Sequence, residues 1–137
     1  MSFRVHFIGI GGVSLSSLAK YMLRMGFTVS GSDARDSVYT EELKRLGASV
    51  FIGHSEQNVE GAQVVVYSDA IKEDNAELAF ARKEKLFIMT RAKLLKSVAE
   101  NFGIVIGVAG CNGKTTVTCM LAHILDSAKK AFTAHIG

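Results

Sequence analysis

Val5-His6-Phe7-Ile8-Gly9-Ile10-Gly11-Gly12 joins a mostly apolar run to a glycine-rich turn near the start of this 137-residue chain. The run predicts a β-strand over residues 5–8. Residues 13–25 predict a helix, because apolar side chains recur there every three or four positions. Residues 27–30 predict the next strand. A strand, a glycine turn, a helix and a second strand are the opening of a doubly wound α/β sheet.

The same alternation continues along the chain. Apolar runs predict strands at residues 49–52, 64–67 and 86–89, and helical spacing predicts helices at 38–46, 75–84 and 92–101. Residues 64–67 are nearly all β-branched, which is typical of a parallel strand covered on both faces. Asn75 is a suitable N-cap. The sequence therefore predicts a Rossmann-like parallel sheet flanked by helices.

The pattern starts afresh after residues 101–103. Ile104 to Ala109 predicts a buried parallel strand, residues 115–128 a helix, and residues 131–136 the next strand. We therefore expect a first domain over residues 1–102 and the first βα unit of a second domain, truncated, over 103–137. One strand and one helix do not bury their own apolar faces, so this second unit is expected to continue beyond Gly137.

A phosphate-binding loop is predicted between that strand and helix. Glycine backbone N–H groups can close around phosphate oxygens, and the helix N-terminus and a lysine add positive charge. The short pattern G-x-x-G-K-[ST] is present, whereas Val108 replaces the first glycine of the longer G-x-x-x-x-G-K-[ST]. The alternative is a glycine turn that opens an ordinary helix. The residues expected at ATP, with Lys114 catalytic and Thr115 on Mg²⁺, are Gly110, Cys111, Asn112, Gly113, Lys114, Thr115 and Thr116.

The first glycine loop has the layout of a nucleotide-binding fingerprint. Gly9-x-Gly11-x-x-Ser14 follows a strand, and Asp33 ends the next strand 22 residues after Gly11. Ser14 replaces the third glycine, so the pattern supports a nucleotide diphosphate rather than NAD in particular. The alternative for Asp33 is a carboxylate that caps the loop. Two phosphate loops in one chain indicate an ATP-driven reaction on a nucleotide-linked substrate.

Composition excludes several other classes. The net charge is +3 with scattered lysines and arginines, which argues against a nucleic-acid partner. The chain has no apolar run long enough for a membrane span, no signal peptide is recognisable, and two cysteines make no disulfide framework. We expect a cytoplasmic protein.

The ordered motifs of the chain resemble the Mur ligase family over nearly its whole length. The matching segments are His6 to Gly12, Ser30 to Asp33, Leu46-Gly47-Ala48, Gly53-His54, Ser68-x-Ala70-Ile71, Asn75-x-Glu77, Arg91-Ala92 and the second glycine loop. The resemblance implies the N-terminal part of an ATP-dependent, ADP-forming carboxylate–amine ligase of peptidoglycan synthesis. It further implies that L-alanine is added to UDP-N-acetylmuramate through an acyl phosphate, and that the part alone is inactive.

The resemblance also implies which residues hold the UDP-linked substrate: Gly9, Ile10, Gly11, Gly12, Val13, Ser32, Asp33, Ser68, Ala70 and Ile71. Four departures from the family pattern leave the substrate open. Cys111-Asn112 replaces Thr-His, Ser14 replaces glycine, Asp69 replaces a small hydroxyl residue, and Lys93 replaces glutamate. A divergent ligase with another UDP-sugar substrate is one alternative. An NAD-sensing module or NAD-dependent oxidoreductase is another, although neither explains Lys114.

Overall fold

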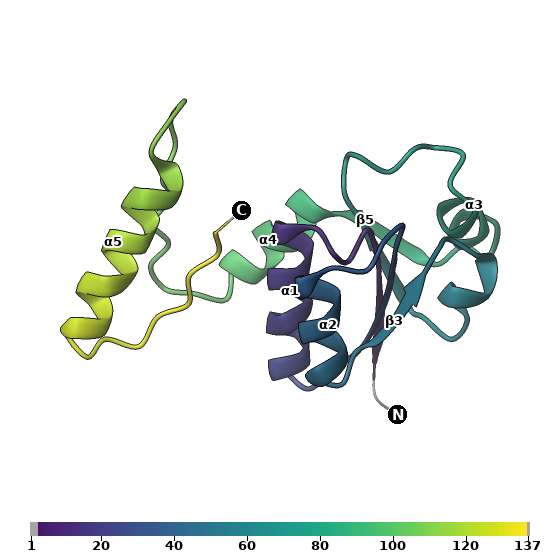
Figure 1. Cartoon of the computed structure of the whole chain (residues 1–137), viewed down its shortest axis with the longest axis horizontal. Helices are drawn as coiled ribbons and strands as arrows, with labels where there is room; N and C mark the ends of the chain where they lie inside the picture. Colours follow the sequence, from purple (N-terminus) through teal and green to yellow (C-terminus); the bar gives the residue numbers. More distant parts are fainter. Residues whose placement is uncertain (1–2, 137) are drawn as a thin grey trace.

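A five-stranded parallel sheet forms the centre of the structure, with strand order β3-β2-β1-β4-β5 (Figure 1). The computed structural model describes residues 3–136. Its elements are β1 (Arg4–Ile8), α1 (Val13–Arg24), β2 (Thr28–Asp33), α2 (Val38–Arg45), β3 (Ser49–Ile52), the 3₁₀ turn η1 (Glu56–Val59), β4 (Val64–Tyr67), α3 (Ala76–Lys83), β5 (Phe87–Thr90), α4 (Arg91–Ala99) and α5 (Lys114–Ser127).

The strand order reverses direction between β1 and β4. From β1 the chain steps outward through β2 to β3, and it then returns to place β4 and β5 on the other side of β1. The connections after β1 and β4 therefore leave in opposite directions and open a crevice at the carboxyl edge of the sheet. This is the place where doubly wound folds bind ligands.

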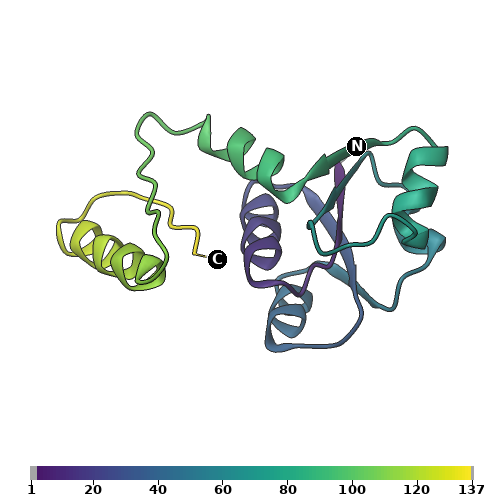
Figure 2. The ribbon, with the colours of Figure 1, turned by 90° about the horizontal axis from the view of Figure 1, so that it is seen from above.

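The sheet is covered on both faces, as the apolar β4 predicted. Phe7 and Val66 pack with α1, α2 and α4 on one face, whereas Ile8 and Val65 pack with η1 and α3 on the other. All four side chains are fully buried. Figure 2 shows α1 and α2 on one side of the sheet and α3 on the other. Because successive side chains of a strand point to opposite faces, consecutive residues of β1 and β4 pack into two separate hydrophobic cores.

The predicted helix starts are confirmed by capping contacts. Asn75 accepts hydrogen bonds from the backbone N–H groups of Glu77 and Leu78 at 3.0 and 3.2 Å, so it caps α3 as expected. Ser37 and Thr40 form a reciprocal capping box at the start of α2. These contacts fix where both helices leave the sheet.

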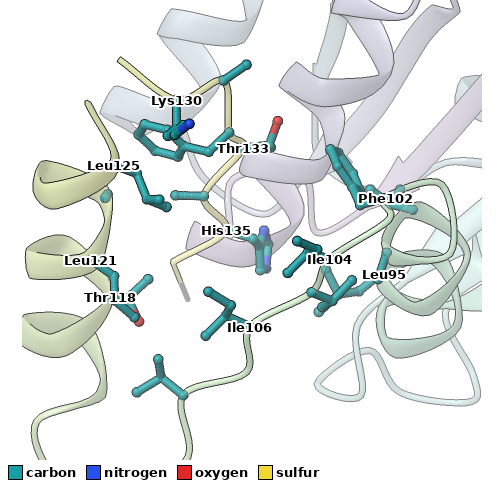
Figure 3. A pocket seen from close by; sticks show the side chains of 18 residues that line it. Leu95, Phe102, Ile104, Ile106, Thr118, Leu121, Leu125, Lys130, Thr133 and His135 are labelled. Carbon is teal, nitrogen blue, oxygen red and sulfur yellow. The ribbon is translucent and has the colours of Figure 1, made fainter. Parts of the chain in front are cut away.

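The strands predicted at residues 104–109 and 131–136 are wrong. Within residues 3–136 neither segment pairs with another strand, and Ile104 is 85% exposed. A β-strand needs a neighbouring backbone for its N–H and C=O groups, and both segments lie away from the sheet beyond α4. Instead they line a cavity of about 570 Å³ together with α4 and α5 (Figure 3). Only the helix of the second βα unit is formed, and the domain division at residue 102 stays a prediction.

Candidate functional site

The first glycine loop is fastened to the end of β2. The N–H groups of Gly9 and Ile10 both donate to the Ser32 carbonyl, at 2.8 and 2.9 Å. The Gly11 N–H donates to Asp33 Oδ2 at 2.9 Å, and the Gly12 N–H turns back to the Gly9 carbonyl at 3.1 Å. Gly9 has a φ of 85°, a left-handed conformation that favours glycine. Four consecutive N–H groups of the loop are therefore engaged within the protein.

The groups left to an anion are those of the helix that follows. Gly12 is the N-cap of α1 and supplies no side-chain cap. The N–H groups of Val13 and Ser14 therefore begin a helix whose positive end faces the crevice between β1 and β4. A phosphate group is the ligand that such an end favours.

Asp33 adopts the loop-capping role that sequence reasoning left open as an alternative. Its carboxylate accepts from Gly11 N–H at 2.9 Å and from Arg35 N–H at 3.4 Å. A Cβ on Gly11 would stand 2.9 Å from Asp33 Oδ2 and 3.1 Å from the Thr40 methyl, so glycine permits this close approach. Contact between Asp33 and a ribose stays a prediction.

The turn after β4 lies against the same loop. Ser68 and Ile71 close a turn through a 3.0 Å backbone hydrogen bond, and Ala70 within it is exposed. A Cβ at Gly9 would meet Ile71 Cδ1 at 3.4 Å and Ser68 Oγ at 3.8 Å. The structure therefore brings the residues predicted from β1, β2 and β4 together at the switch point of the sheet. Asp69 is exposed in this turn.

Ser14, which departs from the expected glycine, connects three segments. Its hydroxyl lies 2.9 Å from His135 Nε2 and accepts a hydrogen bond from Arg91 Nη1 at 3.2 Å. Burial, with the nearby Arg91 charge, lowers the pKa of His135. The first turn of α1 is thereby joined to the start of α4 and to the segment over residues 131–136.

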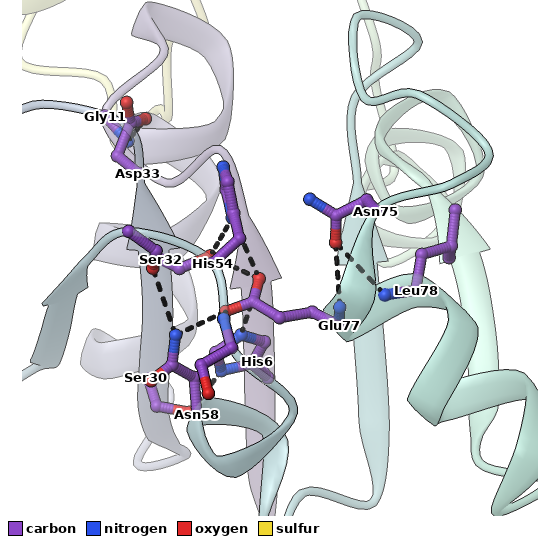
Figure 4. A network of polar contacts seen from close by, with 12 residues as sticks. His6, Gly11, Ser30, Ser32, Asp33, His54, Asn58, Asn75, Glu77 and Leu78 are labelled. Carbon is purple, nitrogen blue, oxygen red and sulfur yellow. Dashed lines mark hydrogen bonds and ion pairs between the residues drawn. The ribbon is translucent and has the colours of Figure 1, made fainter.

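A buried polar network below the crevice was missed by sequence reasoning. Glu77 is fully buried and accepts from Ser32 Oγ at 2.5 Å, from Asn58 Nδ2 at 2.6 Å and from His54 Nδ1 at 3.2 Å (Figure 4). His6 Nε2 lies 3.7 Å from this carboxylate and has no hydrogen-bond partner in the described part of the chain. The only available sequence signal was the set of polar residues within the family motifs.

Glu77 is held in its ionised form by these contacts. Burial alone raises the pKa of a carboxyl group, but His6, Ser32 and Asn58 outweigh it and lower the pKa of Glu77 to about 2. The network therefore carries a negative charge directly beneath the residues that anchor the glycine loop.

The second glycine loop is exposed at the start of α5. Gly113 has a φ of 77° and is the N-cap, and the Lys114 ammonium donates to the carbonyls of Gly110 and Cys111 at 2.7 and 3.4 Å. Thr115 and Thr116 lie in the first helical turn and are also exposed. The lysine thus folds over its own loop. Figures 1 and 2 show α5 standing apart from the sheet, so the two loops are not brought together.

Across the described residues no group of three or more histidine, cysteine or acidic side chains is arranged to hold a metal ion. Among the helices of residues 3–136, none combines the length and the apolar character needed to cross a membrane.

Comparison with known proteins identifies the family. The model of the Mur ligase family, catalytic domain, matches residues 4–103. A UDP-N-acetylmuramate–L-alanine ligase of Clostridium acetobutylicum is 48% identical over 124 residues, which are 90% of this chain and 27% of that protein. One of the same name from Acetivibrio thermocellus is 45% identical over 133 residues, 97% of this chain and 28% of that protein. The chain thus spans little more than a quarter of these relatives.

Solved structures agree with this fold. The UDP-N-acetylmuramate–alanine ligase of Thermotoga maritima superposes with a TM-score of 0.89 at 32% identity, covering 93% of this chain and 30% of that one. A murein peptide ligase of Psychrobacter arcticus superposes with a TM-score of 0.88 at 30% identity, covering 93% and 27%. Because the family model matches residues 4–103, which include the first glycine loop and its anchors Ser32 and Asp33, the chain belongs to the Mur ligase family.

Proposed function

We propose that this chain is the N-terminal, substrate-holding part of an ATP-dependent ligase that adds L-alanine to UDP-N-acetylmuramate. The observation that carries the proposal is the glycine loop at the β1/β4 switch point, packed against the turn of Ser68 to Ile71. The relatives that share this sequence are named for that reaction. We place the protein in the cytoplasm, in keeping with the two free cysteines, Cys111 and Cys119, which a reducing compartment keeps as thiols.

The UDP moiety would lie in the crevice at the carboxyl edge of the sheet. Its diphosphate would face the loop Gly9–Val13, where the helix N-terminus favours negative charge. Ser32 and Asp33 would border it from β2, and Ser68, Ala70 and Ile71 would border it from β4. Asp69 is exposed in that turn, so its carboxylate can point to solvent and avoid repelling the diphosphate.

The second loop would hold ATP. Gly110 to Thr116 provide a left-handed glycine, a free helix N-terminus and a lysine beside it, which together suit a polyphosphate. Lys114 would exchange its bonds to the loop carbonyls for the β- and γ-phosphate oxygens, and the Thr115 hydroxyl would hold Mg²⁺. The metal supplies charge neutralisation on the phosphates when bound.

The reaction follows from activation of a carboxylate. The γ-phosphoryl group passes to the muramate carboxylate and ADP leaves. The L-alanine amine then attacks the acyl carbon, phosphate leaves with the electron pair of the broken C–O bond, and the nitrogen loses a proton as the amide forms. Charge grows on the transferring group, so an ammonium at Lys114 stabilises the transition state more than the ground state.

A second candidate is a ligase that joins a peptide rather than one amino acid. The murein peptide ligase of Psychrobacter arcticus superposes nearly as well as the alanine ligase of Thermotoga maritima. Ser14, with its bonds to Arg91 and His135, also alters the first turn of α1 beside the proposed diphosphate position.

Phosphate release from ATP by the whole protein that contains this chain tests the two candidates. We expect release to require both UDP-N-acetylmuramate and L-alanine, and the 137-residue chain alone to release none. Release that requires UDP-N-acetylmuramate and a peptide, with no response to L-alanine, would select the second candidate.

A further inference from the structure

Glu77 joins three segments that are far apart in the sequence. It lies in the first turn of α3, and its side chain crosses to the end of β2 and to the loop after β3 (Figure 4). Oε2 accepts from Ser32 Oγ at 2.5 Å and from His54 Nδ1 at 3.2 Å, and Oε1 accepts from Asn58 Nδ2 at 2.6 Å. The Ser55 N–H adds a longer contact of 3.4 Å to Oε1. One carboxylate thus receives donors from residues 32, 54, 55 and 58.

Filling this position with a carboxylate is costly unless every bond is made. An ionised group loses its hydration on burial, whereas an apolar side chain of similar volume would fill the same space without that loss. A fully bonded network of this kind fixes the positions of its donors, because each donor must point at its acceptor oxygen. Glu77 fixes one such donor near the glycine loop and another in the loop after β3.

Ser32 connects Glu77 to the glycine loop. Its hydroxyl donates to Glu77, and its carbonyl accepts the N–H groups of both Gly9 and Ile10. The next residue, Asp33, holds the Gly11 N–H. The end of β2 is therefore the support on which the loop rests, and Glu77 holds that support from beneath.

His54 connects Glu77 to the loop that follows β3. Its Nδ1 lies 3.0 Å from Ser32 Oγ and 3.2 Å from Glu77 Oε2, and 27% of its side chain is exposed. With Nδ1 fixed in the network, the rest of the ring is directed out of it. Figure 4 shows the imidazole extending from Glu77 toward the end of the sheet that carries Gly11 and Asp33.

We propose that Glu77 is a positioning residue for the UDP-substrate pocket. Its bonds to Ser32 and His54 hold in place the His54 imidazole and the Ser32 carbonyl to which the Gly9 and Ile10 amides of the glycine loop are bonded. Glu77 itself reaches no ligand. Without the Glu77 carboxylate the loop is less ordered in the free protein, although every group that faces the crevice remains. Ligand binding must then order the loop, which lowers the affinity. The identity of the ligand rests on the proposed function, whereas the positioning of the loop does not.

Glu77→Gln in the 137-residue chain tests this role with two readouts. Glutamine keeps the shape but turns one oxygen acceptor into an N–H donor. That donor opposes either Asn58 at the Oε1 position or Ser32 and His54 at the Oε2 position, so the complete set of bonds cannot be kept. NMR hydrogen exchange reports on the Gly9 and Ile10 amides, and calorimetry reports the affinity for UDP-N-acetylmuramate. We expect exchange at Gly9 and Ile10 to become about tenfold faster, and the affinity to fall by about tenfold, the usual scale for one hydrogen bond to a charged group.

Glu73→Gln is the matched control. Glu73 is an exposed glutamate whose ion pair with Arg82 lies on the surface, and 75% of its side chain is exposed. We expect it to leave both readouts at the wild-type values. The Phe7 amide, inside β1, reports global unfolding. The positioning role therefore predicts a larger acceleration of exchange at Gly9 and Ile10 than at Phe7 in Glu77→Gln.

Three results decide the matter. Wild-type exchange at Gly9 and Ile10 in a folded Glu77→Gln protein would overturn the proposal, as would equal acceleration at Phe7. Faster exchange at the two loop amides, with no binding of UDP-N-acetylmuramate even by the wild type, would support the positioning role and reject the ligand. If Glu77→Gln does not fold, Ser32→Ala carries the hydrogen-exchange test at Gly9 and Ile10, because it removes the bond to Glu77 and keeps the Ser32 carbonyl.

Discussion

Acidification should destabilise this protein through Glu77 more than through any surface carboxylate. Its pKa lies at about 2 in the folded chain against an ordinary value of 4.5, because the nearby His6 and the hydrogen bonds from Ser32 and Asn58 outweigh the effect of burial. A carboxyl group whose pKa is depressed on folding stabilises the fold above its unfolded pKa. That stabilisation is lost as the pH falls from about 4.5 toward 2.

The size of the effect follows from the two pKa values. A difference between 4.5 and about 2 corresponds to about 3 kcal/mol in the free energy of unfolding at neutral pH. Protonation of Glu77 removes about 1 kcal/mol of this stabilisation by pH 4 and about 2 kcal/mol by pH 3. The loss is therefore confined to a window in which the Glu77 network takes up one proton.

Urea unfolding of the wild type and Glu77→Gln at pH 7, 4 and 3, followed by circular dichroism, measures this contribution. Glutamine does not titrate, so the loss between pH 7 and pH 3 should be smaller in the variant by about 2 kcal/mol. Glu73→Gln, an exposed glutamate, should lose as much as the wild type. Equal losses in the wild type and Glu77→Gln would refute the depressed pKa and the bonding that explains it.

Three further outcomes are expected. Gly31→Ala should lower the free energy of unfolding by about 2–3 kcal/mol in urea titrations. The added Cβ would stand 2.5 Å from Ile10 Cδ1 and 2.6 Å from the Phe7 carbonyl oxygen. Gly103→Ala, whose Cβ would have nothing within 4 Å, is the control that should change little. Asn75→Ala should cost about 1 kcal/mol, seen as a lower thermal midpoint, since it removes the cap of α3; an unchanged midpoint would mean that the cap adds no stability. In the whole protein, Lys114→Ala should slow ATP turnover by about 10²–10³-fold, the scale of losing one preorganised charge contact, with unchanged UDP-N-acetylmuramate affinity; near-wild-type turnover would favour a simple glycine turn at residues 110–116.

Local patterns predicted the sheet because each apolar run between residues 4 and 90 finds a neighbouring backbone to pair with. The apolar run of β4 correctly indicated cover on both faces, and Asn75 correctly indicated the start of α3. The same reasoning failed at residues 104–109 and 131–136, because an apolar run becomes a strand only where another backbone pairs with it.

In the candidate site, too, local sequence patterns could be predicted and contacts between distant residues could not. The glycine loop and Asp33 were predictable, because their spacing repeats a known fingerprint. The role of Glu77 was not, because its partners Ser32, His54 and Asn58 lie 19 to 45 residues away and meet only in the folded sheet. A glutamate after an N-cap also has an ordinary local explanation, as an acid that suits the helix dipole.

Calorimetric titration of the 137-residue chain with UDP-N-acetylmuramate, and separately with NADH, tests the central claim that the β1/β4 crevice holds a UDP-linked substrate. The account predicts saturable binding of UDP-N-acetylmuramate that Gly11→Ala weakens, because the added Cβ would stand 2.9 Å from Asp33 Oδ2 and displace the loop. Saturable binding of NADH without binding of UDP-N-acetylmuramate would contradict the account and assign the loop to a dinucleotide.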